Sequence, residues 1–187
     1  MNLDEGARIF DFSLRAIPKD PGSGFFDALE IEASGLGGDP QQWAHLNLRR
    51  HGVYRWDLKY DRSEYFFSVP DFALGQHTND NLRQTLDSLL EFHPGKSRVY
   101  LGFARREFDG PAFLTQDFAR DEFLVFAPAD RQTDDARAGI DFPLGRWALN
   151  LEQGYRKLET LSEYELPSGS GAGNNPGNNS TLSSFLR

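Results

Sequence analysis

The chain has 187 residues, of which 39% are hydrophobic and 26% charged, and its formal net charge is −8. Its basic residues are interleaved with acids, so we expect no nucleic-acid partner, and the absence of cysteine excludes disulfides, thiolate catalysis and sulfur-based zinc sites. The N-terminus lacks the basic residues of a secretory signal and no long apolar segment follows, so we expect a cytoplasmic protein without a membrane partner.

The first seventy residues have the alternating pattern of antiparallel strands. Apolar residues at every second position predict half-buried strands, and clusters of Gly, Pro and Asp separate them. Residues 43–48 fit a helical turn and a strand equally well, and a tight turn is expected at 61–63. The predicted strands cover residues 9–16, 25–33, 53–60 and 64–69. The first two of these strands are expected to form a hairpin.

Two later segments have apolar residues at helical spacing. A helix is predicted over residues 79–93, with Leu82, Leu86, Leu89, Leu90 and His93 as its stripe. A second helix is predicted over residues 145–164, with Trp147, Leu151, Tyr155, Leu158 and Leu161 as its stripe. Strands are expected at 98–104 and 122–127, with a further segment over 113–118 between them and a charged loop over 129–139. The predicted fold is therefore α+β, an antiparallel sheet of about six or seven strands packed by two helices.

The composition changes after Pro167. Residues 1–167 are expected to form one globular domain, and residues 168–180 are rich in Gly, Ser and Asn, which predicts a flexible linker in a disordered C-terminal tail. The final segment, residues 181–187, ends the tail with apolar side chains at helical spacing. We interpret this segment as a short docking peptide whose contacts come from Leu182, Phe185, Leu186 and Arg187.

No catalytic or metal-binding motif is found in the chain. The four histidines, His45, His51, His77 and His93, lack the spacing of metal ligands, so we expect no metal and no cofactor. Alternation over residues 55–61 puts two cations and two carboxylates on one strand face, which we interpret as cross-strand ion pairing. Aromatic walls with nearby cations would suit a small ligand. Such a pocket would be formed by Tyr54, Trp56, Tyr60, Arg105 and Arg106.

The sequence favours a non-enzymatic protein–protein interaction module, such as an adaptor, chaperone or immunity-type partner. Its acidic body would bind one protein, for which the charge favours a basic partner, and its tail would dock onto another protein or a sister subunit. One alternative is a small-molecule-binding domain or hydrolase that uses a carboxylate, such as Asp57 or Glu64, beside aromatic residues. Another is a structural component or cargo of a larger assembly, recruited by its tail. The oligomeric state is left open.

Overall fold

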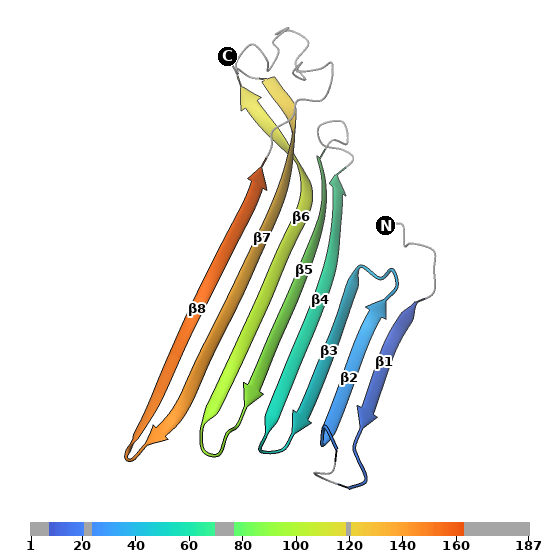
Figure 1. The fold of residues 1–187 in the computed structure, drawn as a ribbon. Helices are drawn as coiled ribbons and strands as arrows, with labels where there is room; N and C mark the ends of the chain where they lie inside the picture. The colour runs from blue at the N-terminus through green and yellow to red at the C-terminus, as the bar shows by residue number, and fades with distance from the viewer. Residues whose placement is uncertain (1–7, 21–23, 70–76, 119–120, 163–187) are drawn as a thin grey trace. The chain divides into compact units, whose positions relative to one another are not determined.

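The described part of the chain forms one antiparallel sheet of eight strands. A computed structural model gives residues 8–20, 24–69, 77–118 and 121–162. Neighbouring strands follow the chain order, and Figure 1 shows consecutive strands running in opposite directions. The strands are β1 (Ile9–Ala16), β2 (Ala28–Leu36), β3 (Gln41–Arg50), β4 (Tyr54–Val69), β5 (His77–Phe92), β6 (Arg98–Phe118), β7 (Asp121–Leu144) and β8 (Trp147–Ser162).

The chain divides into two compact units. The first unit comprises residues 1–63, 83–107 and 132–159, and the second comprises residues 64–82, 108–131 and 160–187. Strands β1 to β3 belong wholly to the first unit, whereas β4 to β8 contribute residues to both. The observed registers of β1 with β2, β2 with β3, and β3 with β4 therefore all lie in the first unit.

Alternation gives the first unit two sheet faces of opposite character. Leu46 of β3 pairs with Ile31 of β2 and Leu58 of β4, so apolar side chains meet across three strands. Asn47, one residue further along β3, pairs with Asp57 and points to the other side because successive strand residues alternate. We call the side of Leu46 the uncharged face and the side of Asn47 the charged face.

Side-chain contacts extend both faces to β8. The indole N–H of Trp56 donates to Ser88 Oγ over 3.0 Å, which places Ser88 of β5 on the uncharged face. Asp135 of β7 lies 3.3 Å from Arg106 of β6 and 2.5 Å from Arg156 of β8, so these three residues share the charged face. The period of two then assigns the neighbouring residues of each strand.

The sheet buries few hydrophobic side chains. Among the described residues, the buried hydrophobic side chains are Ala28, Ala33 and Tyr100, and many large apolar side chains are exposed. The described residues contain no helix, so no helix from this part of the chain covers either face. No helix there has the length and apolar character needed to cross a membrane.

The predicted α+β fold is wrong, because both predicted helices are strands. The segment predicted as a helix over 79–93 lies in β5. Leu82, Leu86 and Leu90 are four residues apart, a spacing that lies on one side of a helix and also on one side of a strand. Gln84 and Ser88 occupy the intervening positions on the same strand face, where they accept hydrogen bonds from Tyr60 and Trp56. These polar positions hid the strand alternation.

The second predicted helix, over 145–164, is β8 for the same reason. Trp147, Leu151 and Tyr155 are again four residues apart, and Leu149 supplies the intervening apolar residue of a strand. The expected helix start is a two-residue hairpin turn between β7 and β8. Gly145 in this turn has φ = 64°, a conformation that short hairpin loops require and that side chains other than glycine disfavour.

Several smaller expectations are also corrected. The turn expected at 61–63 lies inside β4, where these residues pair with Gln41, Gln42 and Trp43. The ambiguous segment 43–48 is part of β3, and the loop expected at 129–139 lies inside β7. The hairpin of the first two strands is confirmed by the β1–β2 register. The linker and docking peptide predicted over 168–187 lie outside the described residues.

Candidate functional site: the two faces of the first unit

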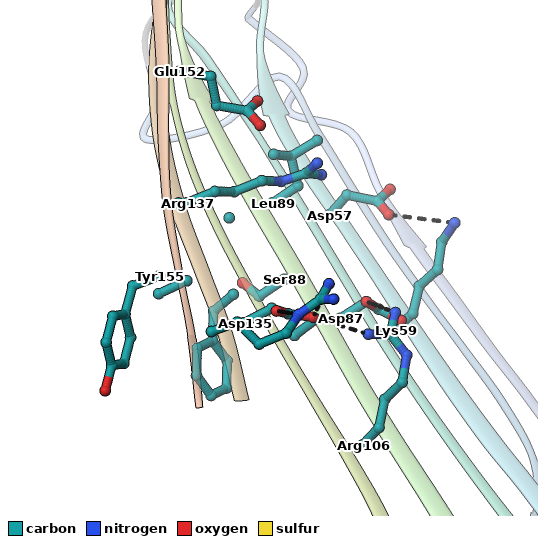
Figure 2. A pocket seen from close by; sticks show the side chains of 16 residues that line it. Asp57, Lys59, Asp87, Ser88, Leu89, Arg106, Asp135, Arg137, Glu152 and Tyr155 are labelled. Atoms are coloured by element: carbon teal, nitrogen blue, oxygen red, sulfur yellow. Dashed lines mark hydrogen bonds and ion pairs between the residues drawn. The ribbon is translucent and has the colours of Figure 1, made fainter. Parts of the chain in front are cut away.

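The charged face contains a hollow of about 730 Å³, lined by residues of β4 to β8 within the first unit. Figure 2 shows the charged side chains of these strands gathered on one side of the sheet, with Tyr155 pointing away from them. Two glycines, Gly102 and Gly154, leave room between the strands. The charged lining residues are Asp57, Lys59, Asp87, Arg106, Asp135, Arg137, Glu152 and Arg156.

Opposite charges neutralise one another across this hollow. Asp135 accepts hydrogen bonds from Arg156 at 2.5 Å and 3.2 Å, and it also pairs with Arg106 at 3.3 Å. Arg106 extends the network to Asp87 at 3.5 Å. The hydrogen bond from Arg156 is the main reason that the pKa of Asp135 lies below its usual value. The carboxylate is therefore anionic at neutral pH, which suits an ion pair and not a proton donor.

At the β3–β4 side of the hollow, Asp57 gathers several donors. His45 Nε2 and Asn47 Nδ2 each lie 3.1 Å from Asp57 Oδ2, and Lys59 lies 3.7 Å from Oδ1. Partial burial acts to raise the pKa of Asp57, but the hydrogen bonds and the charges of His45 and Lys59 outweigh burial and lower it. Asp57 thus anchors a cross-strand network of the kind expected from the sequence for the row 55–61.

One cation of the hollow lacks a carboxylate partner. Arg137 has no ion pair among the residues that the structure describes, and its side chain is exposed. It lies over Gly102, where an added Cβ would be 2.7 Å from Arg137 Nε. The guanidinium therefore uses the space that the missing side chain of Gly102 leaves open, and it extends across the hollow in Figure 2.

Tyr100 is a buried aromatic residue of the charged face. Its hydroxyl donates to Glu152 over 2.6 Å, and Arg98 lies 4.7 Å from its ring centroid. The hydrogen bond to Glu152 is the main cause that raises the pKa of Tyr100. The ring covers Gly139, where an added Cβ would lie 2.6 Å or less from three ring and hydroxyl atoms. An aromatic ring thus fills the gap that a strand glycine creates.

The uncharged face leaves many large apolar side chains exposed to solvent. Its central residues include no Asp, Glu, Lys or Arg, although the opposite face of the same strands is crowded with them. Many of its large side chains are exposed, with fractions from 38% for Phe103 to 79% for Trp147. The exposed members also include Phe10, Phe12, Leu14, Phe92, Leu101, Leu149, Leu151 and Tyr155.

The five residues of the predicted ligand pocket are divided between two faces. Tyr54, Trp56 and Tyr60 alternate with charged residues of β4 and lie on the uncharged face. Arg105 pairs with Asp134 over 2.7 Å at the end of that face, whereas Arg106 lies on the charged face. The structure thus brings together the three aromatic residues but does not bring Arg106 to them.

Sequence reasoning missed Asp135, Arg137, Glu152 and Arg156 as lining residues of the hollow. They lie in the segments predicted as a loop and a helix, so no common face was expected. A signal was present, because polar or small residues occur at every second position from 133 to 141. The docking residues proposed in the tail lie outside the described residues.

The described residues contain no group of three or more His, Asp or Glu side chains arranged to hold a metal ion. Comparison of the chain with protein-family models, with curated proteins and with solved structures gives no match. A functional hypothesis must therefore come from the two faces themselves.

Proposed function

We propose that this chain is a non-enzymatic binding protein that works through the uncharged face of its first unit. The observation that carries the proposal is the exposure of large apolar side chains across that face, such as Leu101 at 51%, Leu151 at 54% and Tyr155 at 69%. Extended apolar surfaces of this kind mark interaction sites, since leaving them in water is unfavourable. The face therefore has a nonpolar partner in the working protein.

The charged face supports a binding role more than an enzymatic one. Its carboxylates Asp57, Asp135 and Asp141 all have pKa values below the usual range, chiefly because hydrogen bonds to their ionised forms outweigh burial. General acid catalysis at neutral pH needs the opposite shift. The ion pairs instead keep this side hydrated and fix the pairing register of the strands.

A nonpolar fluorescent dye such as ANS tests the proposal on the full chain. The folded protein is expected to enhance dye fluorescence, and Leu151→Asp is expected to reduce the enhancement at least twofold. Leu158→Asp is the matched control, because Leu158 is 63% exposed on the same strand but alternation places it on the charged face. Equal dye binding by both variants, with unchanged circular dichroism, would contradict the proposal.

A further inference from the structure

The uncharged band of the first unit has a defined length along the strands. It runs over residues 54–60 of β4, 86–92 of β5, 136–142 of β7 and 147–155 of β8. At about 3.3 Å per residue, these segments are roughly 20–27 Å long. That length is on the scale of the apolar band, about 25 Å, that strands present to a bilayer.

Aromatic side chains border this band at both ends. One row contains Tyr54, Phe92, Phe142 and Trp147, at the end where β5 leads to β6 and β7 turns into β8. His93 N donates to Val53 O over 2.8 Å, which confirms that the start of β4 lies beside the end of β5. The other row contains Phe103 and Tyr155, and Tyr60 is the last aromatic residue of the band on β4.

Charges resume directly beyond the second aromatic row. Arg105 follows Phe103 on the same face and pairs with Asp134, and Lys157 follows Tyr155 and pairs with Glu159 over 2.7 Å. The order along the strands is thus uncharged band, aromatic row, charged row. Trp and Tyr favour the boundary between hydrocarbon and water because they combine an apolar ring with a polar group.

Three polar side chains within the band have partners in the sheet. The Trp56 indole donates to Ser88, and the Tyr60 hydroxyl donates to Gln84 over 3.1 Å. Gln153 donates to the carbonyl of Gly154 over 2.9 Å. A protein interface usually offers roughly one hydrogen bond for each 100–200 Å². Hydrocarbon offers none, so polar groups in contact with it must be hydrogen-bonded within the protein. Because these side chains are satisfied inside the sheet, they need no hydrogen bond from a partner and can contact hydrocarbon.

The border groups complete this pattern. Trp147 and Tyr155 are 79% and 69% exposed, and neither the indole N–H nor the hydroxyl has a hydrogen-bond partner among the described residues. At the edge of a hydrocarbon layer, these two groups would reach lipid headgroups.

We infer that the uncharged face lies against the hydrocarbon chains of a lipid bilayer while the charged face stays in contact with water. This inference rests on the proposed function, for which it names the partner. It replaces the sequence-based expectation of no membrane partner, which was drawn from the lack of a long apolar run. A strand needs no such run, since alternate residues suffice to make one face apolar.

The test uses the full chain and neutral phosphatidylcholine vesicles. Co-flotation should place the wild-type chain with the vesicles, and Leu151→Asp should weaken partitioning at least tenfold because a carboxylate must enter hydrocarbon. Leu158→Asp, on the charged face, should change partitioning less than twofold. Leu101→Asp provides a second variant on the uncharged face, and circular dichroism verifies that each variant keeps its strand content.

Tryptophan quenching identifies the face in contact with lipid. Trp43 pairs with Ser34 and Asp61 on the charged face, whereas Trp147 lies on the uncharged face. A chain that retains only Trp147 should be quenched by brominated lipid, and one that retains only Trp43 should not.

The outcomes separate the two proposals. Lipid is overturned as the partner if the wild-type chain fails to float, or if brominated lipid quenches both tryptophans equally. If Leu151→Asp still reduces dye binding in that case, the proposed function stands. A stable dimer in sedimentation that Leu151→Asp dissociates also overturns lipid and assigns the face to a second copy. If Leu151→Asp binds the dye and floats as well as the wild-type chain does, both the proposed function and the lipid inference are overturned.

Discussion

Gly139→Ala tests whether the charged face depends on close packing of Tyr100. The new Cβ would lie 2.6 Å or less from three atoms of the tyrosine, so the ring must move from its position beside Arg98 and Glu152. Overpacking of this kind costs about 1–3 kcal/mol of unfolding free energy. For a chain of this size, that loss lowers the melting temperature by roughly 2–12 °C.

Gly154→Ala is the matched control. Its new Cβ would meet the carbonyl oxygen of Ala136 at 3.7 Å, an ordinary contact, so this variant should keep or slightly raise the melting temperature. Thermal unfolding followed by circular dichroism measures both variants. In a Tyr100→Ala background the obstructing ring is absent, and Gly139→Ala should then have little further effect. A Gly139→Ala cost that persists without the ring would refute the packing argument.

Two further predictions concern pH and the tail. Asp135 and Asp141 have lowered pKa values in the folded state, so the unfolded chain binds more protons in acid and stability should fall as the pH drops below about 5. Asp135→Asn should flatten this acid dependence, as measured by melting temperature from pH 7 to pH 3, and an unchanged slope would contradict the assigned ion pairs. A copy that ends at Pro167 should lose any protein partner held by Leu182, Phe185 and Leu186, which a pull-down at low and moderate salt would detect. Identical partner sets for both lengths would remove the docking role of the tail.

The N-terminal part of the fold could be predicted because its alternation is uninterrupted. From Phe10 to Ala16 of β1 and in the first half of β4, apolar and polar residues alternate at every position, and only a strand fits that period. The same alternation predicts ion pairs around Asp57, since cross-strand neighbours of opposite charge are expected on a polar strand face. The local sequence pattern is sufficient to predict a strand wherever the apolar residues fit a period of two and no helical period.

The later strands could not be predicted from local pattern. In β5 the spacing of Leu82, Leu86 and Leu90 satisfies both a helix and a strand, and the choice depends on pairing with strands distant in sequence. In the sequence, the polar Ser88 interrupts the alternation expected of a strand. The structure explains its position, because Ser88 accepts a hydrogen bond from Trp56. Because the local pattern predicts helices at β5 and β8, it offers the charges of β7 no partner strand on the β8 side and predicts a loop there.

The division between the two faces also explains why register matters to function in this sheet. A shift of one residue in β6 would carry Arg106 to the uncharged face and Phe103 to the charged one, because the side-chain period is two. The ion pairs of Arg106 with Asp87 and Asp135 oppose that shift, because the shift would break them. It would also place the apolar ring of Phe103 among charged side chains, which is unfavourable. Individually such exposed pairs contribute little to stability because water screens them. Their greater effect is on specificity, since together they hold Asp87, Arg106 and Asp135 off the uncharged face, which is the face of the proposed binding function.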